Sequence, residues 1–134
     1  MAQQFQRDAQ AAAAAVTVVT TAETAIVTTN FVNAPFGTFK AVGLAVVFFT
    51  PGTATTSVQL RIRRNPTGDN TVVANQTIVA GFTVGSLGVV LIAFTDAVPD
   101  GRAVQYQVTV TQAAATGNGT AAAGSYIDAT LLSG

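Results

Sequence analysis

Cysteine, histidine and tryptophan are absent from this 134-residue chain, and only 9% of its residues are charged. Without cysteine the chain can form no disulfide and offers no thiolate nucleophile. Without histidine it lacks the most common general base and the most common ligand of transition metals. These absences disfavour an enzyme, and we predict no catalytic residue, no cofactor and no metal site.

The few charges of the chain are balanced, because six basic and six acidic side chains give a formal net charge of +0. Binding to nucleic acid or to an anionic membrane requires a basic field that this composition does not supply. Soluble domains usually carry about 25% charged residues, and charge helps to keep monomers apart. We therefore predict no nucleic-acid partner, no membrane partner and a surface suited to association with other protein.

The N-terminal stretch is rich in glutamine and alanine, and Phe5 is its large apolar side chain. It lacks the cationic start and apolar block of a secretion signal, so we expect synthesis in the cytoplasm. Such a polar segment has little hydrophobic reason to be ordered by itself. We predict an arm over residues 1–15, held by its own domain or by a neighbouring chain, and one β domain over residues 16–134.

From Val16 onward, runs of β-branched and aromatic residues alternate with Gly, Pro, Asn and Asp clusters, which indicates strands separated by turns. Tight turns are expected at "NPTGDN" and "VPDG". The expected strands are residues 16–20, 23–29, 38–50, 56–64, 70–79, 87–95, 103–112 and 121–132. Eight such strands predict an all-β antiparallel sandwich, for which a jelly roll is the most economical arrangement.

Two strands alternate cleanly between an apolar and a polar face. In "SVQLRIR", Val58, Leu60 and Ile62 share the apolar face. In "VQYQVTV", the alternate residues from Val104 to Val110 do the same. Because successive strand residues point to opposite faces, these strands should have one side in the core and one in water.

Two other strands, "KAVGLAVVFF" and "GVVLIAF", are apolar on both faces. In the first we assign the bulkier face, which contains Leu44 and Phe48, to the core. Each sheet of a sandwich turns one face to the other sheet, so another polypeptide should cover the second apolar face. The predicted subunit interface consists of Gly43, Ala45, Val47, Phe49, Val89 and Leu91. The alternative is cover by a loop or by the arm of the same chain.

The motif "RIRR", residues 61–64, contains half of the basic side chains. It can be an ordinary wet strand face, a weak nucleic-acid patch or a docking contact, because guanidinium groups engage carboxylates in pairs. We predict that Arg61 and Arg63 face an acidic partner and that Phe5 anchors the arm. The aspartates Asp69, Asp96 and Asp100 lack the spacing of a calcium loop and are interpreted as solvated turn residues.

Three segments resemble small structural proteins of tailed bacteriophage virions: "VTVVTTAETAIVTTNFVNAP", "TTSVQLRIRRNPTGDNTVVANQTIVAG" and "YQVTVTQ". The likeness spans roughly residues 16–132. The shared features are a "TTAET" entry strand, a "VQLRIRR" strand before a polar turn, and a late "YQVTVTQ" strand. The resemblance implies a jelly-roll cement or decoration protein that binds the outside of an icosahedral head, often as a trimer, with the major capsid protein as its partner.

The leading functional hypothesis is therefore a non-enzymatic structural protein at the capsid surface of a virion, which oligomerises and bridges capsid subunits. A second hypothesis is a carbohydrate- or receptor-binding module of a virion fibre, for which Tyr106 and Tyr126 are the available aromatic platforms. A third is the major shell protein of a very small virus, disfavoured because a basic arm for genome neutralisation is missing.

Overall fold

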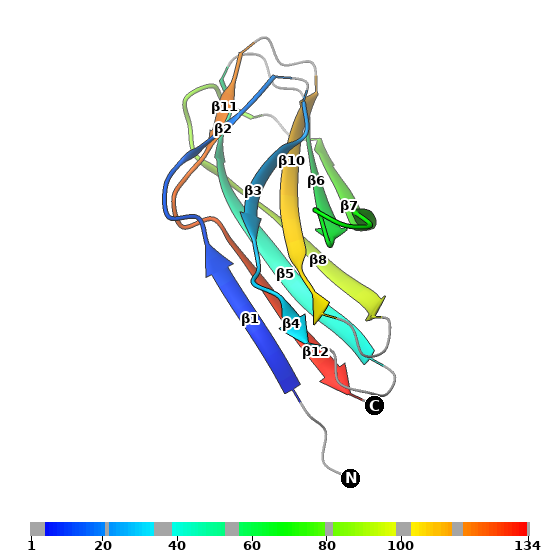
Figure 1. Ribbon diagram of the computed structural model, residues 1–134. Coiled ribbons are helices and arrows are strands. Elements are labelled where there is room, and N and C mark those ends of the chain that lie inside the picture. Colours follow the sequence, from blue (N-terminus) through cyan, green and yellow to red (C-terminus); the bar gives the residue numbers. More distant parts are fainter. Residues whose placement is uncertain are drawn as a thin grey trace.

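The computed structural model describes residues 5–20, 22–33, 39–52, 57–79, 82–98, 103–113 and 117–133. These residues form twelve strands, which build two packed antiparallel sheets and a short two-stranded ladder (Figure 1). The prediction of an all-β antiparallel sandwich is confirmed. The expected turn at 98–101 falls almost entirely outside the described residues.

Sheet A is built around the long strand β5. One edge of β5 pairs with β8 along nearly its whole length, and the other edge pairs first with β12 and then with β11. Beyond these, β1 pairs with β12 and β2 pairs with β11. The strands of sheet A are β1 (Phe5–Ala11), β2 (Val16–Val18), β5 (Phe39–Thr50), β8 (Gly88–Val98), β11 (Gly119–Ala121) and β12 (Tyr126–Ser133).

Sheet B has the order β3-β10-β6-β7. Its strands are β3 (Thr24–Thr28), β6 (Ser57–Arg64), β7 (Thr71–Val79) and β10 (Tyr106–Ala113). A separate ladder joins β4 (Val32–Asn33) to β9 (Ala103–Val104). The chain crosses repeatedly between sheets A and B, so that strands distant in sequence become neighbours, and this order is that of a jelly roll.

The arm predicted over residues 1–15 contributes a strand, because its residues 5–11 form β1 along the outer side of β12 (Figure 1). The domain's own side therefore holds this segment. The strand expected at 121–132 is divided into β11 and β12 by a turn around Gly124, which has φ +90°. Buried Ser125 secures this turn, since its hydroxyl donates to the Ala122 carbonyl over 2.9 Å and accepts from the Phe48 amide over 3.1 Å.

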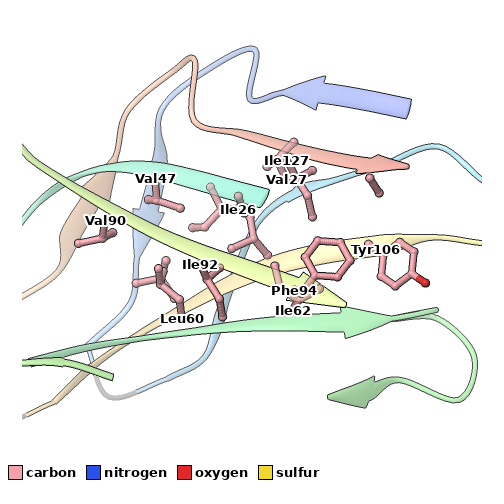
Figure 2. Packing of buried hydrophobic residues seen from close by; sticks show 14 of the residues in the cluster. Ile26, Val27, Val47, Leu60, Ile62, Val90, Ile92, Phe94, Tyr106 and Ile127 are labelled. Carbon is pink, nitrogen blue, oxygen red and sulfur yellow. The ribbon is translucent and has the colours of Figure 1, made fainter. Parts of the chain in front are cut away.

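The core lies between the two sheets and is made of aliphatic side chains with a few aromatic rings (Figure 2). The predicted inner faces of β6 and β10 are confirmed, because Val58, Leu60, Ile62 and the alternate residues from Val104 to Val110 are all buried. Phe94 and Tyr106 meet with their ring centroids 5.0 Å apart. The predicted turn at 65–70 is also confirmed, with the Asn70 amide donating to the Asn65 carbonyl over 2.9 Å.

The predicted orientation of β5 is wrong. Ala45, Val47 and Phe49, which we expected on the outer face, are buried in the core at 0% exposure. Gly43 shares this inner face, because a Cβ on it would overlap the ring of Phe94. The bulkier Leu44 and its neighbours face outward instead.

The small side chains of β5 face the core because large side chains of β8 fill the space beside them. Gly43 lies opposite Phe94, and Ala45 lies opposite Ile92. A protein core is packed to constant density, so the sum of volumes across neighbouring strands decides which face is buried. The bulk of one strand alone does not determine its orientation.

Candidate assembly surface

The outer face of sheet A is apolar across its central strands. From β8 it carries Val89 and Leu91, which are 60% and 53% exposed. From β12 it carries Tyr126, which is 37% exposed. From β5 it carries Val42, Leu44 and Phe48, all partly exposed. We call this set, together with Ala93 of β8, the outer apolar face.

Strand pairing places these side chains directly beside one another. Val46 of β5 points to the same face, although it is only 7% exposed, and lies opposite Leu91 on one side and Tyr126 on the other. Phe48 lies opposite Val89. Opposed residues of an antiparallel pair have Cβ atoms about 5 Å apart, so these side chains form a continuous surface. Extended apolar surface of this kind marks a contact with another molecule more often than isolated exposed residues do.

A shallow depression of about 300 Å³ lies in this face between β5 and β12. Its lining is mixed, with Val42 and Leu44 on the β5 side and Tyr126, Asp128 and Thr130 on the β12 side. The depression is open to solvent, so it can receive a protruding side chain of another molecule.

An ion pair borders the depression on the β1 side. The Arg7 guanidinium donates to both carboxylate oxygens of Asp128, with Nε 2.9 Å from Oδ1. The carboxylate raises the pKa of Arg7 through hydrogen bonding first and charge second. Because both groups are satisfied within the chain, they add little net charge to the outer apolar face.

The outer face of sheet B is mostly polar, in contrast, with Val72 and Val79 of β7 as exposed apolar side chains opposite Arg63 and Ser57. Glu23 accepts hydrogen bonds from Arg61, Arg63 and Thr109, with Glu23 Oε2 2.7 Å from the Thr109 hydroxyl. The hydrogen bond from Arg63 is the main cause that lowers the pKa of Glu23 to about 2. Gln59 donates to Asn75 of β7 over 2.8 Å, which extends this polar surface.

The predicted docking residues Arg61 and Arg63 thus have a carboxylate partner inside the chain. Their side chains are 25% and 21% exposed, and Arg63 uses Nε and Nη2 on Glu23 and Nη1 on the Asn70 carbonyl. This arrangement fits the wet strand face that the sequence offered as an alternative, and the docking of both arginines on an acidic partner stays a prediction. For Phe5 the strand pairing with Leu132 is described, while its side chain lies outside the described positions.

Sequence reasoning missed a polar cluster inside one end of the sandwich. Arg64 donates to Asp96 over 2.9 Å, and the Tyr106 hydroxyl donates to the same carboxylate over 2.8 Å. Asp96 is therefore not the solvated turn residue that we predicted, since its side chain is only 9% exposed. Burial, and then the charge of Asp96, raise the pKa of Tyr106. The sequence did contain a signal for this cluster. Arg64 continues the alternation of Leu60 and Ile62, so its side chain is predicted to point toward the core.

The predicted interface residues divide into two groups. Val89 and Leu91 lie on the outer apolar face, and their contact with a second subunit stays a prediction. The other four, Gly43, Ala45, Val47 and Phe49, belong to the inner face. On the outer face, β5 contributes Val42, Leu44 and Phe48 in their place. Tyr106 is 1% exposed and so cannot serve as a binding platform, whereas Tyr126 is accessible.

Within the described segments, no three histidine, cysteine, aspartate or glutamate side chains come close enough together to hold a metal ion. The same segments contain no helix that is long and apolar enough to cross a membrane.

No protein-family profile matches the sequence, and no curated protein matches it. Solved structures do match. VP2 of infectious bursal disease virus in its subviral particle aligns with a TM-score of 0.55 at 14% identity, over 96% of this chain and 37% of that chain. VP2 in the T=1 particles derived from that virus aligns with a TM-score of 0.56 at 15% identity, over 96% and 35%. Eiger TNF from S. frugiperda aligns with a TM-score of 0.55 at 10% identity, over 96% and 92%.

At these identities the alignments establish a shared fold. The chain spans little more than a third of the VP2 chains, and nearly all of the Eiger TNF chain. Viral particle proteins and a TNF-like protein are thus its neighbours in fold. The narrower resemblance to decoration proteins of tailed bacteriophages stays a prediction.

Proposed function

We propose that this chain is a non-enzymatic structural protein of a virion, which stabilises the shell by joining neighbouring subunits. The observation that carries the proposal is the outer apolar face of sheet A. In a jelly roll of this size, that face has no layer of its own chain to cover it among the described residues. The likeness in fold to VP2 in viral particles supports the same assignment.

The mechanism needs only buried area. Fully burying an aliphatic side chain contributes about 1.5 to 3 kcal/mol, so a few side chains of the outer apolar face can outweigh part of the cost of association. A subunit that lies across a joint between shell proteins adds this contact to both of them. The shell then resists expansion without any chemical step. We place the protein at the capsid surface, with the major capsid protein as its partner.

Co-sedimentation with candidate capsids tests this proposal. Purified chain should sediment with assembled shells, and a Leu91→Glu variant should remain in the supernatant because it places a charge on the outer apolar face. A Thr77→Glu variant, altered on an exposed position of β7 in sheet B, is the matched control and should still bind. Closed shells formed by the chain alone would instead indicate the major shell protein. A chain that neither associates with itself nor binds shells contradicts the proposal.

The depression beside Tyr126 supports a second candidate, a carbohydrate-binding module. An exposed aromatic ring next to a carboxylate and a hydroxyl is a suitable surface for a sugar ring, and Tyr126, Asp128 and Thr130 supply these groups. Glycan-array binding that is lost in Tyr126→Ala and kept in Leu91→Glu would favour this module over the shell protein.

A further inference from the structure

Strand β8 is an edge strand whose second edge is open. In the described part of the chain β8 pairs with β5 alone, from Gly88 to Val98, and no other backbone–backbone hydrogen bond reaches it, although the Ala97 carbonyl accepts from Arg64 Nη1 over 3.3 Å. The neighbouring β7 belongs to sheet B and directs its backbone pairing to β6. An unpaired row of backbone N–H and C=O groups is a template for another strand.

The other edge strands carry features that hinder pairing with a second chain, whereas β8 carries few. β1 contains Arg7 and Asp8, and β2 has three residues. β3 has five residues and a register shift against β10, and the pairing of β7 with β6 is also shifted. β8 has eleven residues, an unbroken register and a single charge, Asp96, which Arg64 already engages. Natural proteins protect edges with charge, bulges or shortness, so a long, regular and apolar edge is expected to have an occupant.

We propose that this occupant is β8 of a second copy of the chain. Two identical strands pair antiparallel about a two-fold axis, and the contact closes on itself because the same groups meet on both sides. An axis through the middle of β8 places Ala93 opposite Ala93 of the second copy. Leu91 then lies opposite Thr95, and Val89 lies opposite Ala97. No charged side chain faces a like charge in this register.

The length of β8 suits pairing with a second strand. At about 3.4 Å per residue, β8 is roughly 37 Å long, so an antiparallel copy in this register meets it along its whole length.

The pairing extends sheet A across two copies and leaves the outer apolar face of both on one side. The joined face is therefore twice as large and remains available to a shell protein. The pairing of β8 with a second copy does not depend on the proposed function. The binding of the joined face to a shell protein rests on the proposed function. The resulting assembly is a dimer, not the trimer that the resemblance implied.

Site-specific crosslinking tests the pairing, because the full chain contains no native cysteine to compete. Ala93→Cys, treated with a short bismaleimide, should give a covalent dimer, since opposed Cβ atoms lie about 5 Å apart. Thr77→Cys on exposed β7 is the matched control and should give background yield. Leu91→Cys and Thr95→Cys should give less dimer than Ala93→Cys because each lies off the axis. Equal yields from Ala93→Cys and Thr77→Cys would overturn the pairing.

A charge at the axis provides a second test. Ala93→Lys places two like charges opposite each other and should raise the dissociation constant of the dimer at least about tenfold, whereas Ala93→Ser should leave it nearly unchanged. If Ala93→Lys dimerises as well as Ala93→Ser, the pairing is wrong. Assembly or shell binding that persists without crosslinking at Ala93 would reject this contact while leaving the proposed function intact.

Discussion

A buried polar cluster lies inside one end of the sandwich, where most neighbouring side chains are apolar. It consists of Arg64, Asp96 and Tyr106. The carboxylate of Asp96 belongs to sheet A, and the two groups that donate to it belong to sheet B. The cluster therefore joins the two layers by directed bonds at one end of the sandwich. A buried charge is tolerated only when it is paired and hydrogen-bonded, so removal of one partner should be costly.

Tyr106→Phe should lower the free energy of unfolding by about 2 kcal/mol, because it removes a hydrogen bond to a charged acceptor and leaves the ring in place. Tyr126→Phe is the control and should change it by less than about 0.5 kcal/mol, since that side chain is exposed. Urea unfolding followed by circular dichroism measures both. Similar midpoints for the two variants would contradict the assigned role of the hydroxyl.

Glu23 should make stability depend on acid pH. Its pKa is lowered from 4.5 to about 2 in the folded chain, mainly by the hydrogen bond from Arg63. A lowered folded-state pKa gives stability that is present above pH 4.5 and is lost as the pH falls toward 2. Glu23→Gln should be less stable than the natural chain by about 1 kcal/mol at neutral pH, because the pair is partly exposed.

The two chains should become equally stable as the pH approaches 2, and urea unfolding over a pH series measures the difference. The difference in the free energy of unfolding between Glu23→Gln and the natural chain should therefore change with pH. A difference that stays constant over this range would show that the carboxylate contributes nothing through its charge.

Strand β5 shows what could be predicted from the sequence and what could not. Apolar runs and turn residues located most of the strands in sheets A and B to within a few residues, and alternation oriented β6 and β10 correctly. The orientation of β5 depends on Phe94 and Ile92, which occupy the core beside Gly43 and Ala45. The register between β5 and β8 is set by contacts between distant parts of the chain, so the residues of β5 alone could not predict it.

The sequence did not predict β1 or the division between β11 and β12, because both depend on other long-range contacts. β1 has few apolar side chains and is ordered by backbone pairing with β12 and by the Arg7–Asp128 pair. The sequence of such a strand contains no hydrophobic pattern that would predict it. The apolar outer surface was foreseen from the two-sided strands, with Val89 and Leu91 assigned to the correct side and the β5 residues to the wrong one.

Gly43→Ala should destabilise the sandwich by about 2 to 3 kcal/mol, since the added Cβ would overlap the Asp128 carbonyl and the Phe94 ring. Gly88→Ala is a matched control at the start of β8, where the nearest atom to an added Cβ is 3.7 Å away. It should be neutral or slightly stabilising because alanine restricts the unfolded chain. Chemical unfolding of both variants tests the inner position of Gly43, and equal stability would contradict it.

At the scale of the whole molecule, the two outer faces differ in chemistry. Sheet B presents Glu23, arginines and amides that satisfy one another, with Val72 and Val79 exposed along β7. Sheet A presents aliphatic and aromatic side chains across its central strands, with the Arg7–Asp128 ion pair beside them and exposed Lys40 at the start of β5. The continuous apolar surface therefore lies on sheet A, and this face is the preferred side for assembly.

Two glutamate substitutions separate folding from assembly. Ala45→Glu, which the sequence pattern marked as an interface change, should instead unfold the chain, because Ala45 is 0% exposed in the core. Leu91→Glu should leave the fold intact, since Leu91 is 53% exposed. Circular dichroism should therefore show native strand content in Leu91→Glu and lost content in Ala45→Glu.

Sedimentation velocity of the natural chain beside Leu91→Glu and Thr77→Glu, over a series of concentrations, separates assembly through the outer apolar face from pairing along β8. The natural chain and Thr77→Glu should form assemblies larger than two copies of the 13.6 kDa chain, while folded Leu91→Glu should stop at the β8-paired dimer. Identical sedimentation of all three proteins would contradict assembly through the outer apolar face, because a charge in the middle of that face would then cost the assembly nothing.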